Sequence, residues 1–358
     1  MRILVTGACG FVGSRILRKF RESLTGAELH GMDNLCRAGS ERNRAVLKEL
    51  GVRFVHGDVR SASDFEALPE VDWVIDAAAN PSVLAGVDGR SSSRQVIEHN
   101  LLGTVNMLEY CRAKSAGFVL LSTSRVYGID TLASLPLKTE DARFALDTKK
   151  PLPSGASARG VNEDFSTTPP LSLYGVSKKM SEDLALEYAR AFKMPVWINR
   201  CGVMAGAGQF GRADQGIVAF WIHSWREDRP LKYLGFGGHG HQVRDVLHPD
   251  DIAALLLKQL HAGSGKPHTP RVVNVGGGIE SAFSLAELSA WCADRFGRKQ
   301  DVIRDGSDRP FDIPWIVLDD SKARETWGWK PEKTKEKIFE EVAEFAEANA
   351  EWMSASAA

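Results

Sequence analysis

Short apolar runs alternate with amphipathic helical segments through the first half of the chain. The runs that predict strands cover residues 2–6, 28–33, 52–56, 73–76 and 118–121. Apolar side chains at helical spacing predict helices over 11–24, 42–50 and 92–114. Strands that are apolar on both faces, each followed by a helix, are typical of a parallel sheet covered by helices on both sides. The pattern therefore predicts an α/β fold with a doubly wound parallel sheet.

The alternation breaks between residues 128 and 170, where prolines, glycines and serines gather. An excursion of this length inside a compact domain is usually a functional loop or partly disordered. Beyond residue 201 the predicted elements are shorter and separated by glycine-rich turns. We expect a first domain over 1–200 and a smaller mixed α/β lobe over 201–358. Some later segments, such as a predicted strand at 272–275, are expected to return to the first domain.

Charge and cysteine usage narrow the class of protein. The 358 residues carry a net charge of -1, which provides no overall field to attract nucleic acid or an anionic membrane. No apolar run approaches the roughly 18 residues that a membrane span requires. The five cysteines are scattered without Cys-x-x-Cys spacing, so we expect neither a disulfide framework nor a zinc site, and a cytoplasmic location. His239 and His241 have no third ligand nearby, so we expect solvated loop residues and no metal.

A glycine-rich turn follows the first predicted strand directly. Gly7, Gly10 and Gly13 are spaced Gly-x-x-Gly-x-x-Gly, and the predicted helix starts within this turn. Such spacing lets backbone N–H groups approach a pyrophosphate and aims a helix N-terminus at its negative charge. The turn therefore predicts a dinucleotide-binding site, to which Phe11 and Val12 also belong.

An acidic residue, Asp33, ends the second predicted strand. In this position a carboxylate can accept both hydroxyls of the adenosine ribose, whereas a 2′-phosphate would meet a like charge. We therefore expect NAD as the cofactor rather than NADP. Arg37 lies close by and could clamp a 2′-phosphate, but we interpret it as a solvated loop residue.

Tyr174 and Lys178 lie four positions apart on a helix predicted over about 173–192. This spacing places both on one face, one turn apart. A phenol with a pKa near ~10 is a poor base at neutral pH, but a neighbouring ammonium stabilises the phenolate. The pair therefore predicts a base that takes a hydroxyl proton while hydride leaves for a nicotinamide.

A cluster of hydroxyl side chains ends the predicted strand at 118–121. Ligands of doubly wound sheets bind beyond the carboxyl ends of the strands, so Thr123 or Ser124 could hydrogen-bond the oxygen that is oxidised. A strand-end turn satisfied by local side-chain hydrogen bonds is the alternative.

Together these motifs resemble the extended short-chain dehydrogenase/reductase family, the NAD-dependent epimerases and dehydratases of nucleotide-sugars. The resemblance covers nearly the whole chain. It is carried by Gly7 to Gly13, Asp33-Asn34-Leu35, Gly57-Asp58-Val59, Asn100 to Thr104, Ser122 to Gly128, Tyr174 to Lys178, and Val243 to His248. It implies a Rossmann-type sheet with a C-terminal substrate lobe.

The resemblance also implies roles for individual residues. Thr123, Tyr174 and Lys178 match the family's catalytic hydroxyl, base and cofactor-anchoring lysine. The resemblance further implies a set of cofactor contacts: Asn34, Asp58, Val59, Ala77, Ala78, Ala79, Asn100 and Ser122. Arg244 and Arg309 are expected to bind the substrate diphosphate, because guanidinium groups bind phosphate bidentately.

A narrower resemblance inside the family points to epimerisation at C2 of a CDP-sugar. It includes the segment around Gln209 and Gln215, which we expect, with Ser124 and Arg125, to contact the substrate. Arg125 stands where that group is expected to carry lysine, and the stretch Ala78 to Ser82 also differs from it. The identity of the sugar is therefore left open.

Three other functions are weighed against the 2-epimerase. A 4-epimerase of a UDP-sugar would need only a different placement of the sugar. A 4,6-dehydratase is disfavoured, because Ser124 and Arg125 follow Thr123 where dehydratases carry Asp-Glu. A non-catalytic NAD-binding sensor would have no reason to keep Thr123, Tyr174 and Lys178 in register.

The expected partner is a nucleotide-sugar, with no nucleic acid and no membrane. We also expect a homodimer or higher homo-oligomer, since related enzymes often pair through two helices of the first domain. The apolar stripe Val105, Leu108 and Cys111 could form such a contact or could face the sheet.

Overall fold

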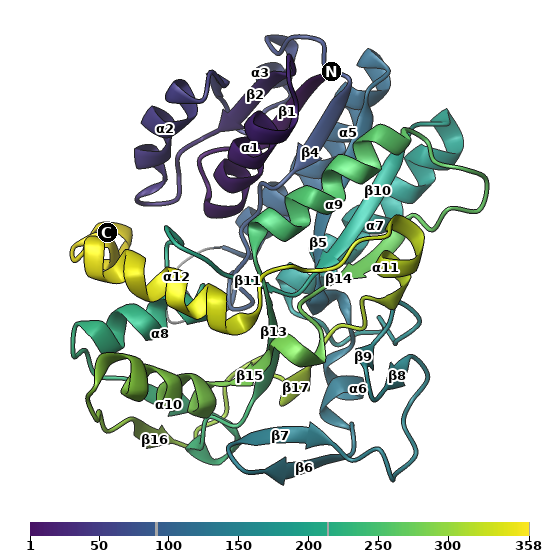
Figure 1. The fold of residues 1–358 in the computed structure, drawn as a ribbon. Coiled ribbons are helices and arrows are strands. Elements are labelled where there is room, and N and C mark those ends of the chain that lie inside the picture. The colour runs from purple at the N-terminus through teal and green to yellow at the C-terminus, as the bar shows by residue number, and fades with distance from the viewer. Residues whose placement is uncertain (90–91, 213–214, 358) are drawn as a thin grey trace.

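The computed structural model describes residues 1–89, 92–212 and 215–357, and its centre is a seven-stranded parallel sheet (Figure 1). The strand order is β3-β2-β1-β4-β5-β10-β14. The strands are β1 (Arg2–Thr6), β2 (Glu28–Asp33), β3 (Arg53–His56), β4 (Trp73–Asp76), β5 (Gly117–Thr123), β10 (Val196–Cys201) and β14 (Val272–Val275). The order reverses between β1 and β4, which makes the sheet doubly wound and confirms the predicted fold class.

Helices cover both faces of this sheet. One face packs against α1 (Phe11–Ser23), α2 (Asn43–Glu49), α9 (Pro249–Ala262) and α11 (Ser321–Trp327). The other face packs against α3 (Ala62–Glu66), α5 (Gly103–Lys114) and α7 (Leu173–Phe192). The strands are therefore buried on both faces, which explains their unbroken apolar runs.

The predicted helix over 92–114 is interrupted by one wide turn. It consists of α4 (Ser93–Ile97), the π-helical segment η2 (Glu98–Leu102) and α5. A π-helical turn is rare and often accompanies functional sites. Here the turn carries the buried side chain of Asn100. Farther along α5, Leu108 and Cys111 are buried in the core beneath the sheet.

Segments that follow residue 200 return to the first sheet. β14 forms its edge beside β10, as the sequence predicts for 272–275. Helix α9 packs along α1, and its apolar residues Ile252 and Leu256 join the core that includes Ile16 and Leu17. The sequence pattern did not single out α9, although its start is marked by a proline after His248.

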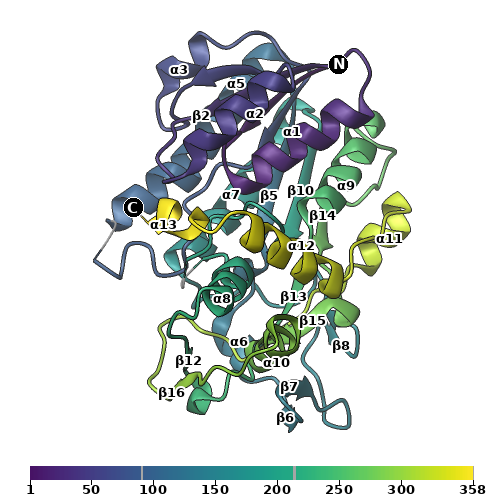
Figure 2. The same ribbon diagram turned by 60° about the vertical axis from the view of Figure 1, so that its left-hand side comes forward.

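The second lobe contains small mixed sheets (Figure 2). Its main sheet joins β11 (Val203–Met204), β13 (Val243–Leu247), β15 (Ala282–Ser284) and β17 (Trp315–Ile316), and a second pair joins β12 (Lys232–Leu234) to β16 (Ile303–Asp305). Its helices are α8 (Ile217–Arg226), α10 (Leu285–Phe296), α12 (Lys335–Ala348) and α13 (Trp352–Ala357). Short 3-10 turns occur in both lobes: η1 (Ser40–Arg42) and η3 (Ser124–Val126) follow strands of the first sheet, and η4 (Phe236–Gly238) and η5 (Ile279–Ser281) lie in the second half of the chain.

The proline-rich excursion is ordered and packs against this second lobe. It forms α6 (Ile129–Ala133) and the hairpins β6 (Leu137–Glu140) with β7 (Arg143–Leu146) and β8 (Ala156–Ser157) with β9 (Gly160–Val161). Its buried Leu132 and Phe165 share one apolar cluster with Trp315 and Ile316. The excursion therefore joins the two lobes.

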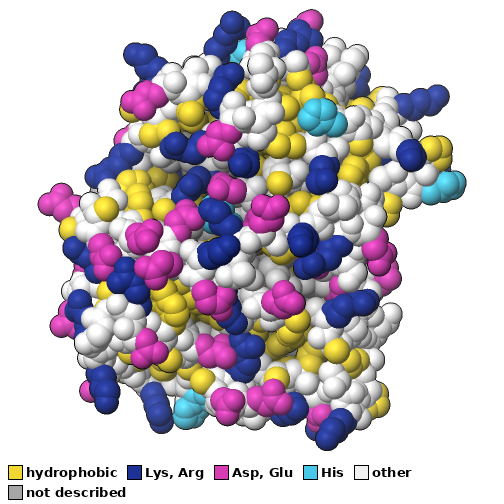
Figure 3. Space-filling view, in the orientation of Figure 1, with side chains coloured by type: hydrophobic (Ala, Val, Ile, Leu, Met, Phe, Trp, Pro, Cys, Tyr) yellow, Lys and Arg dark blue, Asp and Glu magenta, His cyan; other side chains and the backbone are white. Residues whose placement is uncertain are grey.

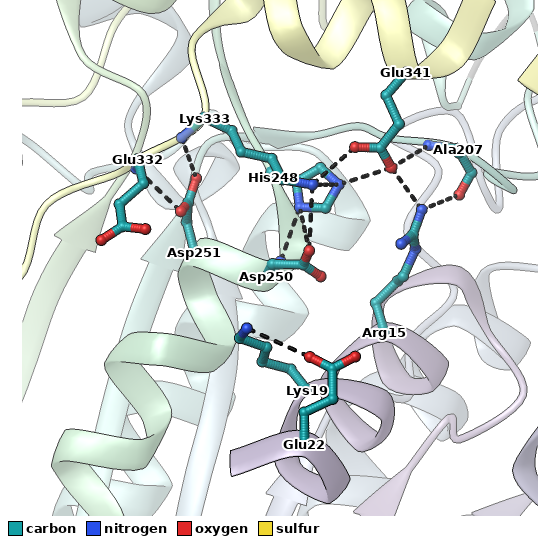
Figure 4. Close-up of polar contacts among 10 residues, drawn as sticks. All are labelled: Arg15, Lys19, Glu22, Ala207, His248, Asp250, Asp251, Glu332, Lys333 and Glu341. Atoms are coloured by element: carbon teal, nitrogen blue, oxygen red, sulfur yellow. Dashed lines mark hydrogen bonds and ion pairs between the residues drawn. The ribbon is translucent and has the colours of Figure 1, made fainter. Parts of the chain in front are cut away.

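A cluster of charged side chains also joins the two lobes (Figure 4). Glu341 on α12 accepts hydrogen bonds from Arg15 on α1 at 2.7 Å, from the buried His248 at 3.2 Å and from Lys333 at 2.8 Å. Lys333 also pairs with Asp250 at 3.3 Å. Burial opposes ionisation of Glu341, but His248 and Lys333 together outweigh it and lower the pKa of this carboxyl. The cluster therefore holds α12 against the first lobe.

The face of the molecule in Figure 3 carries positive and negative side chains side by side. This mixture agrees with the net charge of -1. Within the described ranges, the structure contains no helix long and apolar enough to cross a membrane.

Candidate active site

The glycine turn after β1 is shaped by close backbone approaches. Gly7 has φ of 63°, and a Cβ placed there would lie 2.8 Å from the carbonyl oxygen of Ala77. A Cβ on Gly13 would lie 2.2 Å from the carbonyl oxygen of Gly7. Neither position accepts a side chain. The turn can therefore pack closely against Ala77 and against the start of α1, as a dinucleotide-binding turn requires. The N-terminus of α1 opens at this turn.

The carboxylate of Asp33 lies beside this turn at the end of β2. Its two oxygens accept the backbone N–H groups of Cys9 at 2.9 Å and of Leu35 at 2.8 Å. Burial raises the pKa of Asp33, and these backbone donors oppose that effect. The fixed orientation suits a group that accepts hydrogen bonds from a ribose.

Asn34 and Asp58 contact each other in the loops after β2 and β3. The Asn34 amide donates to Asp58 at 3.0 Å, and Asp58 pairs with Arg60 at 2.6 Å. The Arg60 hydrogen bond is the main reason that the pKa of Asp58 lies well below its ordinary value. Val59, the next residue after Asp58, is buried. The predicted cofactor residues of the two loops therefore lie next to one another.

Arg37 is not the solvated loop residue that we expected. Its guanidinium donates to the side chain of Gln215 at 2.8 Å and to the carbonyl oxygen of Phe210. Gln209 donates to the carbonyl oxygen of Met204 at 2.8 Å. Gln215 therefore lies against the loop that follows Asp33, and Arg37 bridges the two lobes there. Asp214, which precedes Gln215 in the segment of the narrower resemblance, lies outside the described residues.

Thr123 and Tyr174 meet at the carboxyl end of the sheet. Thr123 ends β5, and Tyr174 lies in the first turn of α7, whose cap is Ser172 accepting the N–H of Gly175 at 3.0 Å. Both side chains are buried, and the Thr123 hydroxyl lies close enough to the phenol to favour its ionised form. Burial raises the pKa of Tyr174 to about 12, against the opposing effects of Thr123 and Arg125.

Lys178 lies one turn farther along α7, in a fully buried position. Its Nζ atom is 3.9 Å from Oδ2 of Asp76, the last residue of β4. Sequence reasoning missed Asp76. The available signal was a carboxylate that ends an apolar strand at the edge where ligands of such sheets bind.

Two further predicted cofactor residues are held by buried hydrogen bonds. The Asn100 amide donates to Ser177 at 3.0 Å and its oxygen accepts the N–H of Asn80 at 2.8 Å, so the π-helical turn contacts α7. Ser122 donates to the buried Glu182 at 2.6 Å. Its hydroxyl therefore points into the core rather than remaining available to a ligand. Ala78 is partly buried and Ala79 is exposed on the loop after β4.

Three arginines converge near the reacting groups. Arg244 pairs with Asp312 at 3.1 Å, and Arg125 donates to the carbonyl oxygen of Phe311 at 3.2 Å. Burial, reinforced by Arg244, lowers the pKa of Arg125 to about 9. Arg309 lies close enough to act on both arginines. Two guanidinium groups that interact with Asp312, and a third close to them, form a site suited to an anionic ligand.

The two predicted loop histidines stack on each other. The rings of His239 and His241 are 5.5 Å apart, with His239 exposed and His241 half-buried. Among the residues that the structure describes, no group of three or more His, Cys, Asp and Glu side chains is arranged to hold a metal ion.

The fold and the site together define a class of protein: a dinucleotide-binding α/β enzyme with a tyrosine–lysine pair beside a buried threonine. The sequence matches the NAD dependent epimerase/dehydratase family over residues 3–276. The chain belongs to this family. This confirms the predicted family, the expectation of an enzyme, and NAD as its cofactor.

Relatives of known activity catalyse more than one reaction. A CDP-paratose 2-epimerase from Salmonella typhi is 32% identical over 296 residues, which are 80% of this chain and 82% of that protein. A dTDP-glucose 4,6-dehydratase from Salmonella typhimurium is 24% identical over 380 residues, covering 99% of this chain and 95% of that protein. The narrower sequence resemblance stated above is to the CDP-paratose 2-epimerases.

Solved structures share the fold. A UDP-glucuronic acid 4-epimerase from Bacillus cereus, in complex with UDP-glucuronic acid and NAD, superposes with a TM-score of 0.77 at 23% identity. The match covers 97% of this chain and 99% of that chain. A UDP-glucose 4-epimerase from Thermotoga maritima gives a TM-score of 0.74 at 21% identity, covering 98% and 100% of the two chains.

Proposed function

We propose that the protein is a nucleotide-sugar 2-epimerase that acts on a CDP-sugar by transient oxidation at C2. The observation that carries this proposal is the meeting of Thr123, Tyr174 and Lys178 at the end of the sheet, beside the arginines of the second lobe. The relative from Salmonella typhi is a CDP-paratose 2-epimerase. It supports C2 as the carbon that is inverted and CDP as the nucleotide of the substrate.

The chain's own residues supply binding and proton transfer. Arg244 and Arg309 hold the diphosphate of the substrate, while Thr123 hydrogen-bonds the hydroxyl that reacts. Tyr174 takes the proton from that hydroxyl and returns it after the sugar has presented its other face. The glycine turn and Asp33 would hold NAD, which would supply reversible hydride transfer at the carbon. Net redox change is therefore zero.

Dehydration is disfavoured because the carboxylates near the site already pair with basic side chains. A 4,6-dehydratase needs an acid and a base beside the catalytic hydroxyl, but Ser124 and Arg125 follow Thr123. The nearby carboxylates Asp76 and Asp312 pair with Lys178 and Arg244. Epimerisation at C4 of a UDP-sugar, the activity of the solved relatives, is the second candidate, because it needs the same proton and hydride transfers.

Deuterium labelling distinguishes these reactions. The protein is incubated with CDP- and UDP-sugars that carry deuterium at C2 or at C4, and the products are analysed by NMR. For a 2-epimerase, only the C2 label slows turnover, and the label stays at C2 of the inverted product. A rate effect confined to the C4 label would contradict the proposal. Inversion at C4 would then indicate a 4-epimerase, and loss of the C6 hydroxyl a dehydratase.

The cofactor role of Asp33 gives a second prediction. We expect Asp33→Ala to weaken NAD binding about 10- to 100-fold, because hydrogen bonds to a charged acceptor contribute roughly 1.5–3 kcal/mol. Affinity for NADP should fall less, since the like charge that repels its phosphate is removed. Calorimetric titration with both nucleotides measures the two constants. The matched control is Asp72→Asn on an exposed loop, and unchanged NAD affinity in Asp33→Ala would show that the ribose lies elsewhere.

We also place the protein in a reducing compartment, the cytoplasm. All five cysteines are free, and four of them are buried. This arrangement suits a chain that folds without disulfide exchange.

A further inference from the structure

Asp76 is a buried carboxylate to which the proposed reaction assigns no step. It ends β4 in the middle of the sheet, and 1% of its side chain is exposed. Oδ1 accepts the hydroxyl of Thr6 and the N–H of Ala78, both at 3.2 Å. The Thr104 hydroxyl lies 3.4 Å from Oδ2. Contacts from β1, α5 and the loop after β4 therefore fix the carboxylate in one orientation.

Lys178 is the ion-pair partner of this carboxylate. Its side chain is 2% exposed, and Nζ lies 3.9 Å from Oδ2 of Asp76. A long lysine side chain has many rotamers, and its ammonium is strongly hydrated when exposed. A fixed counter-charge inside the protein therefore decides where a buried ammonium lies. Asp76 is built into the sheet, whereas Lys178 reaches it from α7.

The charge of Asp76 also acts on the phenol of Tyr174. Other groups that face the phenol are Thr123 from β5, Arg125 from η3 and Cys201 at the end of β10. Thr123 and Arg125 favour the phenolate, whereas Cys201 and Asp76 disfavour it. The groups that face Asp76 itself are Thr6, Thr104, Lys178 and the buried thiol of Cys111.

We propose that Asp76 is a positioning residue for Lys178, which holds the ammonium at the end of the sheet. This role rests on the base function of Tyr174 proposed above. A tyrosine that serves an epimerase must take a proton and give it back in each cycle. The negative charge of Asp76 itself disfavours the phenolate of Tyr174, so Asp76 both holds Lys178 and acts on the proton of the base.

Titration of the phenol tests this role without turnover. Ultraviolet phenolate absorbance is measured against pH on the NAD-bound protein and on its Tyr174→Phe derivative, and the difference isolates Tyr174. In Asp76→Asn we expect the pKa of Tyr174 to fall by about one unit, the effect of removing one nearby like charge. The acid limb of the kcat profile should move by the same amount. An unchanged or raised pKa would overturn the proposal.

Asp72→Asn is the matched control for charge. Asp72 immediately precedes β4, at the opposite end of the strand, and pairs with Arg2 at 2.9 Å. The substitution removes the same charge next to the same strand, away from Lys178. The pKa of Tyr174 should stay unchanged. A shift as large as that of Asp76→Asn would mean that the effect is one of net charge, and it would overturn the positioning role.

A double-mutant cycle measured by thermal stability tests the pairing of Asp76 with Lys178, even if the protein proves to have another activity. Lys178→Met leaves Asp76 buried without its cation, so we expect a lower melting temperature at neutral pH. Burial raises the pKa of Asp76, hence the loss should diminish as pH falls and the carboxyl takes up a proton. Lys178→Met combined with Asp76→Asn should recover most of the loss. A double variant as unstable as the sum of the single variants would show that the pair is not coupled.

Discussion

Replacing Tyr174 by phenylalanine is expected to reduce turnover by roughly 100- to 10,000-fold, the usual contribution of a positioned acid–base group. Phenylalanine fills the same buried space beside Thr123, so the fold and NAD binding should remain. Without the hydroxyl, no group at this position can take the proton of the reacting sugar. We would measure kcat together with the amount of NAD that stays bound.

Tyr188→Phe provides the matched control. Tyr188 lies on the same helix, α7, and its hydroxyl hydrogen-bonds Glu109 away from the site. The same chemical change there should leave kcat within about twofold of the parent protein, as expected for a surface substitution outside the site. Near-normal turnover in Tyr174→Phe would contradict the assignment of the base. Loss of NAD from that variant would indicate a structural role.

Replacing Glu182 by leucine is expected to lower the free energy of unfolding by about 3–5 kcal/mol, because it leaves a buried charge without its partner. Glu182 and Arg200 are 1% and 7% exposed, and their closest atoms are 2.8 Å apart. Two nitrogens of Arg200 donate to this carboxylate, and Ser122 donates to it as well. Denaturant unfolding followed by fluorescence measures the loss.

Two further variants distinguish this explanation from simple loss of a contact. Glu182→Leu combined with Arg200→Met removes both charges, so its loss should be clearly smaller than that of Glu182→Leu alone. Glu22→Ala breaks an exposed pair with Lys19 on α1, shown in Figure 4, and should change stability little. A double variant less stable than the single one would show that packing, rather than charge, dominates at this position.

The strands of the sheet could be predicted well from the sequence, because the residues that define each strand lie within that strand and the turns beside it. The bounds of β1, β2, β4 and α7 agree with the predicted ranges, since apolar runs and turn residues determine where such elements begin and end. The wide turn η2 was not predicted, because a π-helical turn adds a residue without interrupting the apolar pattern.

The candidate cofactor and reacting groups could be proposed from the sequence for the same reason. The glycine turn, Asp33 and the tyrosine–lysine pair are each defined by spacing within a short segment. Asp76 and the bridging contact of Arg37 with Gln215 were missed, because their partners lie far away along the chain. The cluster around Glu341 was missed for the same reason. A single sequence shows that such side chains exist, but the tertiary fold determines which of them meet.

The return of β14 and α9 to the first sheet limits how this protein can be recombined with its relatives. β14 pairs with β10 across the sheet edge, and α9 packs on α1. A chimaera that exchanged everything after residue 200 as one cassette would also replace an edge strand and a covering helix of the dinucleotide domain. Specificity grafts should instead use several junctions, so that 249–262 and 272–275 stay with the parent sheet. Shuffling experiments that respect these junctions should give the larger share of folded recombinants.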